Sequence, residues 1–300
     1  MIIALTGATG FLGGHVLTAL LAAGHAVRAL TRRPQDDRAN VTWVSGALDN
    51  RAALETLVTG ADAVVHVAGV VNAPDAAAFD AGNRAGTQAM VDAALSAGVG
   101  RFVHISSLAV REPQLSHYGA SKLAAENAVR ASPLDWHIVQ PPAIYGPGDT
   151  DNLELFRLAK QGFMPLPPPG RLSLIHATDL AELIVAMAQS DTQHSCYQAD
   201  DGAPAGWTHR DYARAIGAAI GRNPVTLSLP QSVLRIGAWL DTRIRGDNAK
   251  LTPDRVAYFC HPDWVIDAAC RPPVSLWAPR IDTHTGLADT AAWYRQNNWL

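Results

Sequence analysis

The 300-residue sequence has few cysteines, no surplus of basic residues and no long apolar run, and each deficit excludes a class of protein. Cys196, Cys260 and Cys270 form no CxxC pair and no cluster with histidine, which argues against a disulfide framework and a zinc site. Lysine and arginine number 24 against 27 acidic residues, so nothing indicates the neutralisation of a nucleic-acid backbone. The sequence contains no stretch of about twenty uninterrupted apolar residues, so it predicts no membrane span.

These deficits predict a globular protein of the reducing cytoplasm, with no metal, nucleic-acid or membrane partner. A hydrophobic content of 48% and a charged content of 17% are enough to build a large core. The apolar segment over residues 1–21 lacks a basic start and is interrupted by glycines, so we predict a strand and a helix there rather than a signal peptide.

The first half of the sequence alternates short apolar runs with stretches of helical periodicity, as stacked βαβ units around a parallel sheet would. Because the runs are short and largely apolar, the sheet is predicted to be buried between two helical layers. The predicted strands cover residues 2–6, 26–30, 41–45, 63–68, 101–106 and 136–140, and the predicted helices cover 15–23, 51–58, 86–97 and 118–131.

The second half has a different texture. A proline-rich loop ends at Gly170 and is followed by a predicted strand over 172–176 and a helix over 179–189, with Asp179 as its N-cap. We predict a dinucleotide-binding domain over residues 1–165, with a return segment at about 171–200, and a substrate-binding lobe over 201–300. Six of the eight tryptophans lie in that lobe, where packing is favoured over a ligand cage.

A glycine-rich turn follows the first predicted strand. Gly7 permits a tight turn, Gly10 lets the backbone approach a pyrophosphate, and Gly13 lets the next helix lie close to the sheet. The helix N-terminus would then direct unpaired N–H groups at phosphates. A tight turn without a ligand is the alternative. The residues predicted to contact the cofactor are Gly7, Thr9, Gly10, Phe11 and Leu12.

The end of the second predicted strand indicates which nicotinamide cofactor is bound. A carboxylate there would hold the ribose 2′-hydroxyl of NAD, whereas an arginine accommodates the 2′-phosphate of NADP. The sequence has no acid at this place but has Arg32 and Arg33, whose guanidinium groups suit a phosphate. We predict NADP rather than NAD, with Arg32 as the first candidate and Arg33 as the second.

Tyr118 and Lys122 are four residues apart, so on a helix both can face one pocket. A nearby ammonium stabilises a phenolate, which would let Tyr118 act as an acid or base near neutral pH. Ser107 follows the fifth predicted strand and could hydrogen-bond the substrate oxygen. The predicted catalytic residues are therefore Ser107, Tyr118 and Lys122.

Together the motifs resemble those of the short-chain dehydrogenase/reductase superfamily, and specifically its extended, atypical-like branch of NAD-dependent epimerases, dehydratases and reductases. The resemblance covers about the first 190 residues. It rests on TGATGFLG at residues 6–13, HVAG at 66–69, SS at 106–107, YGASK at 118–122 and PPAIYGPGD at 141–149.

This resemblance implies a Rossmann-type, doubly wound parallel sheet with a smaller C-terminal substrate lobe, and hydride transfer at nicotinamide C4. Tyr118 would exchange the alcohol proton, Lys122 would also hold the nicotinamide ribose, and Ser107 would polarise the carbonyl. Asn83 would have a structural or proton-relay role. Further residues implied to line the cofactor are Leu48, Ala68, Gly69, Ser106, Pro141, Ala143 and Ile144.

The sequence departs from the family pattern at three places. Gln140 stands where arginine is frequent, so the partner of that arginine needs another explanation. Ala47 replaces an acid that commonly precedes the adenine contact, which leaves Leu48 or Asp49 beside the adenine. The connection between Ser107 and Tyr118 is short, which weakens a sugar-nucleotide substrate.

The leading hypothesis is an NADPH-dependent reduction of a carbonyl, or the reverse alcohol oxidation, on a small or moderately apolar substrate. One alternative is a sugar-nucleotide epimerase or dehydratase that retains NAD. Another is a sensor or assembly protein that binds NADP without turnover. A monomer or a homodimer would fit the sequence.

Overall fold

The computed structural model describes residues 1–246, 249 and 251–300, which form two compact units. The first unit comprises residues 1–140, 180–198 and 271–278, and the second comprises 141–179, 199–270 and 279–300. The chain thus enters the second unit at Pro141, whereas the domain prediction placed this boundary at residue 165.

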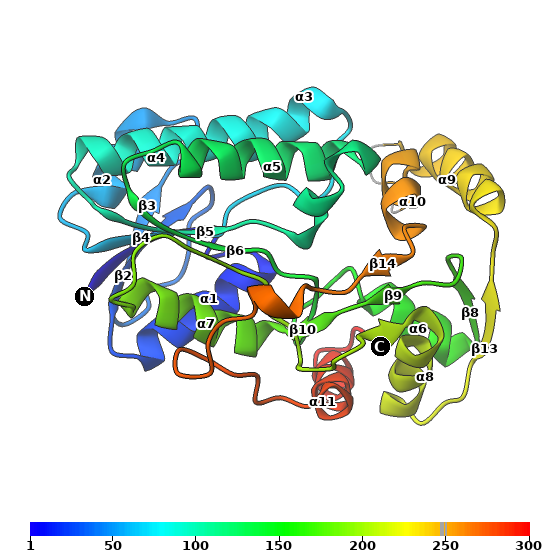
Figure 1. The fold of residues 1–300 in the computed structure, drawn as a ribbon. Coiled ribbons are helices and arrows are strands. Elements are labelled where there is room, and N and C mark those ends of the chain that lie inside the picture. Colours follow the sequence, from blue (N-terminus) through cyan, green and yellow to red (C-terminus); the bar gives the residue numbers. More distant parts are fainter. Residues whose placement is uncertain (247–248, 250) are drawn as a thin grey trace. The chain divides into compact units, whose positions relative to one another are not determined.

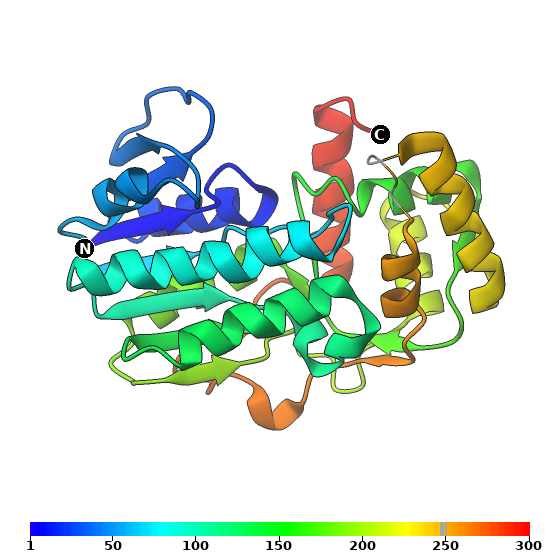
Figure 2. The same ribbon diagram turned by 90° about the horizontal axis from the view of Figure 1, so that it is seen from above.

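The first unit is built on a seven-stranded parallel sheet in the order β11-β6-β5-β4-β1-β2-β3. One face is covered by α2, α4 and α5, and the other by α1 and by most of α7 (Figure 1), while Figure 2 shows α4 and α5 side by side. This is the predicted Rossmann-type α/β fold. The strands are β1 (Ile2–Thr6), β2 (Ala26–Thr31), β3 (Val41–Ser45), β4 (Ala63–His66), β5 (Arg101–Ile105), β6 (Asp135–Val139) and β11 (Ser195–Tyr197). The helices are α1 (Phe11–Ala22), α2 (Arg51–Val58), α4 (Gly86–Ser96), α5 (His117–Arg130) and α7 (Ala177–Gln189).

The core between the sheet and the layer of α2 and α4 is apolar, as the sequence pattern predicted. Leu54 and Leu57 of α2, Met90 of α4, and Val64 and Phe102 of the strands are at most 2% exposed. Such burial stabilises the fold by removing apolar surface from water. It also explains why the strands read as continuous apolar runs, since helices cover both faces of the sheet.

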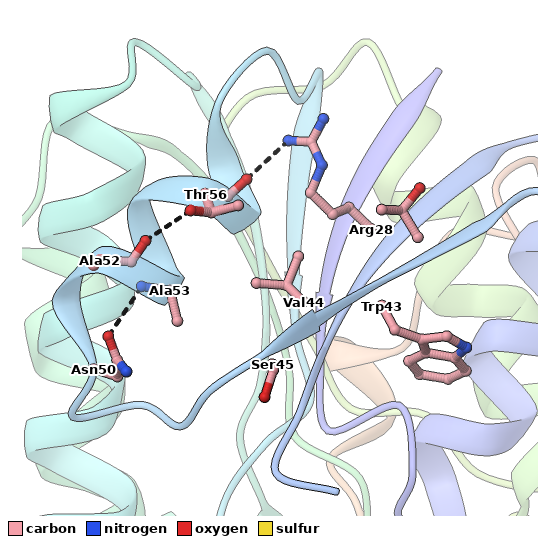
Figure 3. Close-up of a pocket in the computed structure, with 9 residues that line it drawn as sticks. Arg28, Trp43, Val44, Ser45, Asn50, Ala52, Ala53 and Thr56 are labelled. Carbon is pink, nitrogen blue, oxygen red and sulfur yellow. Dashed lines mark hydrogen bonds between the residues drawn. The ribbon is translucent and has the colours of Figure 1, made fainter. Parts of the chain in front are cut away.

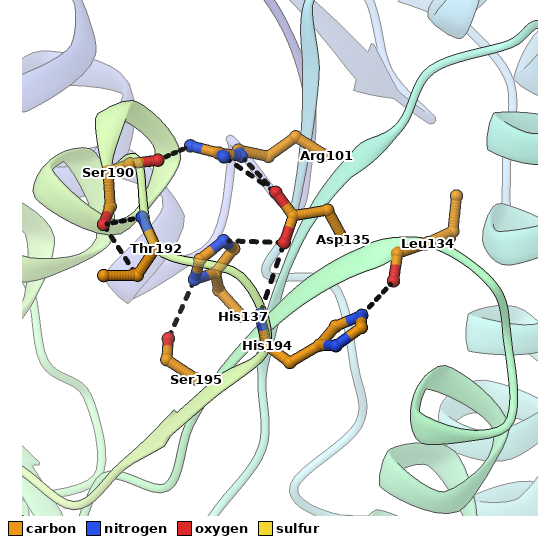
Figure 4. A network of polar contacts seen from close by, with 8 residues as sticks. All are labelled: Arg101, Leu134, Asp135, His137, Ser190, Thr192, His194 and Ser195. Carbon is orange, nitrogen blue, oxygen red and sulfur yellow. Dashed lines mark hydrogen bonds and ion pairs between the residues drawn. The ribbon is translucent and has the colours of Figure 1, made fainter.

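A polar network holds the return strand β11 to the first part of the chain (Figure 4). The Arg101 guanidinium donates two bonds to Asp135, at 3.1 and 2.7 Å, and a third to the carbonyl oxygen of Ser190. The buried His137 ring lies 2.8 Å from the Ser195 hydroxyl. Because burial lowers the pKa of His137, the ring is neutral at neutral pH. Polar contacts of β5 and β6 therefore attach β11, which comes much later in the sequence, to the first unit.

The second unit packs short strands against helices. β7 (Ala143–Tyr145) pairs in parallel with β10 (Leu174–His176), and β8 (Phe163–Leu166) with β13 (Val225–Ser228), while β9 (Arg171–Leu172) lies between β12 (Trp207–Thr208) and β14 (Asp263–Trp264). Tyr145, Phe156, Ile216, Leu287 and Tyr294 are fully buried in its core. Its helices are α6 (Leu153–Gln161), α8 (His209–Ala219), α9 (Gln231–Arg245), α10 (Pro253–Phe259) and α11 (Thr283–Gln296).

Most tryptophans of the predicted lobe pack as expected, with one exception in the second unit. Trp264 stacks on Tyr258 with ring centroids 4.6 Å apart, and Trp293 meets Trp299 edge-on at 4.9 Å. Trp239 of α9, in contrast, is 54% exposed.

The predicted N-cap at Asp179 is wrong. Helix α7 already begins at Ala177, and the ring nitrogen Nδ1 of His176 accepts the N–H of Thr178 at 3.2 Å. The Asp179 carboxylate instead accepts the N–H groups of Arg280 and Ile281, at 3.1 and 3.0 Å. The capping role thus belongs to His176, while the Asp179 carboxylate is engaged by backbone donors 101 and 102 residues further along the chain.

The glycine-rich turn joins β1 to α1, and its backbone packs directly against the first turn of that helix. Gly7 has a φ of +76°, which only glycine adopts readily. A Cβ atom on Gly13 would lie 1.8 Å from the Gly7 carbonyl oxygen, so the first helical turn can rest on the loop only without a side chain. Helix α1 therefore begins at Phe11, four residues before the predicted start, and includes Gly13 and Gly14.

Gly13→Ala should destabilise the protein, because the added methyl overlaps backbone atoms that cannot move independently. We expect the free energy of unfolding to fall by about 1–3 kcal/mol or more in urea titrations. Gly14→Ala is the matched control, since its Cβ would lie 4.0 Å from the nearest atom. It should leave stability unchanged or raise it by up to about 1 kcal/mol. Equal effects of the two substitutions would contradict the close approach.

Candidate cofactor and catalytic site

The N-terminus of α1 is arranged to receive an anion. Gly10 is its N-cap, no side chain bonds the free N–H groups of the first turn, and no acidic residue lies in that turn. Helix N–H groups in this state, at the positive end of the helix dipole, bind phosphates. Thr9 and Gly10 are exposed, whereas Leu12 is buried and Phe11 is half-buried against the His15 ring. Thr9 and Gly10 thus offer the most accessible part of the loop.

The ends of β1 and β4 are tied together beside this loop. The Thr6 hydroxyl accepts the Ala68 N–H at 3.2 Å and lies 2.8 Å from Nδ1 of His66. A Cβ on Gly7 would lie 2.7 Å from the Ala68 nitrogen, so the two chain segments are in direct contact. Burial, together with the charge of Lys122, lowers the pKa of His66 to about 3, and the ring is therefore a neutral structural group.

Lys122 is a buried ammonium at the end of β5. Its Nζ donates a 2.5 Å hydrogen bond to the carbonyl oxygen of Ile105. Burial lowers the pKa of Lys122 to about 8, while the charge of Glu126 opposes that shift. A Cβ on Gly69 would lie 3.8 Å from Nζ, an ordinary van der Waals distance, and 2.8 Å from Oδ1 of Asn83, which is a clash. The predicted residues Gly69 and Lys122 are thus brought together.

Asn83 fixes the helix that carries Tyr118 and Lys122. Its Oδ1 accepts the Val70 N–H at 2.8 Å, and its Nδ2 donates to the Val70 carbonyl and to the Ser121 hydroxyl, at 3.0 and 2.9 Å. The Ser121 hydroxyl in turn donates to the Tyr118 carbonyl at 2.8 Å. Asn83 therefore has a structural role that links the loop after β4 to the first turns of α5.

Tyr118 and Ser107 occupy neighbouring segments. Tyr118 is half-buried in the first turn of α5, where the Ser116 hydroxyl caps the helix by accepting the Gly119 N–H at 2.9 Å. The buried Ser107 hydroxyl accepts the Ala109 N–H at 3.2 Å. A Cβ on Gly119 would lie 2.9 Å from the Ala109 carbonyl oxygen, so this turn of α5 touches the segment that Ser107 caps. The structure places Ser107, Tyr118 and Lys122 at the same end of β5 and α5.

Ser106, predicted to contact the cofactor, has its hydroxyl engaged elsewhere. It donates a 2.7 Å bond to the Glu126 carboxylate, which is buried. The Gln140 amide donates to both oxygens of that carboxylate at 3.1 and 2.9 Å, and Arg130 donates at 2.9 and 2.7 Å. Arg130 therefore supplies the positive charge that Gln140 lacks. The sequence did not single out Glu126 and Arg130, although their spacing of four residues on a helix was available as a signal.

Arg32 and Arg33 are exposed at the end of β2. The Thr31 hydroxyl orders this turn by donating to the Arg33 carbonyl at 2.7 Å. A hollow of about 480 Å³ adjoins it, with Thr31, Arg33, Gln35 and Trp43 in its wall. Arg33 thus lines this open hollow together with Asp37, and Arg32, the first candidate, is not part of its wall.

A second hollow lies beside β3 (Figure 3), and the charged residue in its wall, Arg28, has a structural role. Arg28 donates to the carbonyls of Thr56, Leu57 and Thr59, at 3.2, 3.1 and 2.5 Å, and so neutralises the C-terminal end of α2. None of the predicted catalytic residues lines it.

The remaining predicted cofactor residues are divided between the two units. Leu48 packs in the first unit, where a Cβ on Gly86 would lie 2.7 Å from its methyl group. Ala143 and Ile144 belong to β7 of the second unit and pair with Leu174 and Ile175, and Pro141 begins that unit. Across the described parts of the chain, no three His, Cys, Asp or Glu side chains are grouped to hold a metal ion.

Comparison with known proteins places this site in a family. The sequence pattern of the NAD(P)H-binding family matches residues 7–191. The chain is 36% identical over 312 residues to the ceramide reductase of Caulobacter vibrioides (strain NA1000 / CB15N), an alignment that covers 100% of this chain and 96% of that protein.

Solved structures share the fold across nearly the whole chain. The crystal structure of gox2253 superposes with a TM-score of 0.80 at 24% identity, covering 100% of this chain and 99% of that one. UDP-N-acetylglucosamine 4-epimerase from Bacillus cereus gives 0.74 at 18% identity, covering 98% and 96%. The family match over more than half of the chain and the full-length relative show that the chain belongs to the NAD(P)H-binding family.

Proposed function

We propose that the protein is an NADPH-dependent ketoreductase whose substrate carries its carbonyl group on an apolar, lipid-like molecule. The observation that carries the proposal is the buried Lys122 ammonium, one helical turn from Tyr118, at the end of β5 in an NAD(P)H-binding fold. NADPH, when bound, supplies the hydride.

The residues present suit a dinucleotide. The uncapped N-terminus of α1 suits the pyrophosphate, and Thr9 and Gly10 directly before it are exposed. Exposed guanidinium groups at Arg32 and Arg33 suit a 2′-phosphate, and residues 32–35, directly after β2, include no carboxylate that would hold a free 2′-hydroxyl. These features favour NADP over NAD.

Tyr118 supplies the proton in the proposed reduction. Loss of its proton leaves a phenolate, and the Lys122 ammonium stabilises that negative charge from one turn away. The bond from Nζ to the Ile105 carbonyl holds the ammonium in place, and the links from Asn83 through Ser121 hold the helical turn. Ser107 donates its hydroxyl hydrogen to the substrate oxygen, since its oxygen already accepts the Ala109 N–H.

The proposed substrate class follows from the relative that matches the chain from end to end. That relative is named for ceramide, a lipid, and covers both chains almost completely. A sugar-nucleotide epimerase with retained NAD is the second candidate, because a 4-epimerase shares the fold. The arginines at the end of β2 and the short connection between Ser107 and Tyr118 speak against it. A sensor that binds NADP without turnover is a third, which the intact Ser107, Tyr118 and Lys122 disfavour.

The reductase should consume NADPH with long-chain ketones, followed by the loss of nicotinamide absorbance. We expect neither NADPH consumption nor conversion of UDP-sugars, whereas an epimerase would convert them without net consumption of cofactor because it returns the hydride to its substrate. Tyr118→Phe should lower kcat about 10²–10⁴-fold, the range for loss of a general acid, and change the Kd of NADPH less than about threefold. An active phenylalanine variant would refute the proton donor, and tightly retained NAD with conversion of UDP-sugars would replace the reductase by an epimerase.

Cofactor choice can be tested at the end of β2. Arg32→Ala and Arg33→Ala should each be made, and at least one should weaken NADP binding about tenfold while changing NAD binding less than about twofold. Because Arg33 lines the adjoining hollow and Arg32 does not, we expect Arg33→Ala to weaken NADP binding more than Arg32→Ala. Arg214→Ala is a matched control, because Arg214 lies on α8 of the second unit and its side chain is 61% exposed. Parallel losses for both cofactors would show that these arginines do not select the 2′-phosphate.

The reduction should weaken as the pH rises through about 8, the pKa of Lys122 in the folded protein. Below this value the side chain is an ammonium that stabilises the phenolate, and above it the charge is lost. A profile of kcat/KM against pH should therefore decline on its alkaline side near 8. Lys122→Met should be less active and should lack this decline. Persistence of the same decline in the methionine variant would assign it to another group.

A further inference from the structure

Helix α9 of the second unit has an apolar side that nothing in the described chain covers. It contacts α10 with the opposite side, where Ala238 is buried and Leu234 and Asp241 are half-buried. In both Figure 1 and Figure 2 the helix lies at the outer edge of the second unit. The exposed side chains are Val233 at 45%, Ile236 at 61%, Trp239 at 54%, Leu240 at 46% and Ile244 at 79%.

These five side chains lie on one side of the helix and are called the crest below, and Ser232 and Arg243 lie within the same arc. At about 100° per residue, they span about 140° of the helix circumference. The crest is convex, so it suits insertion into a soft apolar layer better than it suits reception of a ligand. No helix among the described residues has the length and apolar character needed to cross a membrane, and α9 itself is 15 residues long.

The neighbouring strands extend the apolar surface. Phe163 of β8 pairs with Val225 of β13, and both are exposed, as is Leu227 two residues further along β13. Residues two apart on a strand share a face, so the three side chains form a second small apolar patch. In Figure 1, β13 leads into α9 at the outer edge of the second unit.

The charge of α9 is opposite to that of the chain as a whole. The helix carries Arg235, Arg243 and Arg245 against one carboxylate, Asp241, whereas the whole chain has a net charge of −3. Asp241 pairs with Arg245 at 3.2 Å on the side of the helix that faces α10. Arg243 lies over the exposed Trp239 ring, 4.8 Å from its centroid, and so places a cation at the apolar crest.

We propose that α9 docks the protein on the surface of a lipid bilayer that contains anionic headgroups. An amphipathic helix with tryptophan and aliphatic residues on one face and arginines beside them lies in the bilayer interface, and anionic lipids strengthen its binding. The arginines complement the negative headgroups, and the crest enters the acyl boundary. Docking rests on these surface residues alone, and it would also bring the proposed enzyme to a lipid substrate.

Vesicle flotation tests this surface with the full chain and no cofactor or substrate. We expect the protein to float with phosphatidylcholine vesicles that contain phosphatidylglycerol, more than with phosphatidylcholine alone, and less as the salt concentration rises. The double variant Ile236→Asp with Leu240→Asp should bind the anionic vesicles at least about tenfold more weakly. Arg235→Gln with Arg243→Gln should lose the preference for anionic vesicles. Val274→Asp is the matched control: it replaces an 84% exposed apolar residue of the first unit and should bind like the wild type.

Three results would overturn the proposal. The first is failure of the wild type to float with anionic vesicles, and the second is an aspartate variant that floats as well as the wild type. The third is a wild-type dimer in sedimentation that the aspartates convert to a monomer, which would assign the crest to a second copy of the chain. Thermal unfolding of each variant checks that the fold is retained. Turnover of a short, water-soluble ketone should be unaffected by the α9 variants, so a failure of docking and a failure of the ketoreductase proposal are separately visible.

Discussion

The site depends on one buried interaction, the hydrogen bond from the Lys122 ammonium to the carbonyl oxygen of Ile105. A charged amine is unfavourable in a dry interior, so it needs both a carbonyl acceptor and a carboxylate nearby. The carbonyl comes from the end of β5. The carboxylate comes from Glu126, which lies on α5 one turn after Lys122. The bond thereby fixes α5 lengthwise along the sheet, and the position of Tyr118 follows from it.

Much of the first unit could be predicted from the sequence, because its information is local. The strands over 2–6 and 41–45 and the helix over 51–58 have the predicted bounds, since buried parallel strands and amphipathic helices leave clear periodic patterns. The start of α1 was misplaced because Gly13 and Gly14 read as a turn. The glycine at 13 is in fact needed inside the helix, where only the three-dimensional approach to Gly7 reveals the reason.

The rest could not be predicted, because it depends on contacts between distant segments. Asp179 has the local signature of a helix cap, yet its partners are backbone groups at 280 and 281. Ser106 lies in a family motif, but its hydroxyl is directed to a carboxylate on another element. The exposed Trp239 was expected to pack like its neighbours in sequence, and composition alone cannot distinguish a buried aromatic from one on an outer crest.

Helix α5 carries Tyr118, Lys122, Glu126 and Arg130 at successive intervals of four residues. The order is phenol, cation, anion and cation, and each member lies within one turn of the next. Arg130, at the far end, is partly open to water, while Lys122 and Glu126 are buried. A change of charge at the solvent-facing Arg130 therefore alters the electrostatic potential at the Glu126 carboxylate. Because Glu126 acts on the pKa of Lys122, the change also reaches the ammonium one turn from Tyr118. Relatives could therefore tune the acid strength of the reactive end by substitutions at the opposite end of a single helix, leaving the residues that meet the ligand untouched.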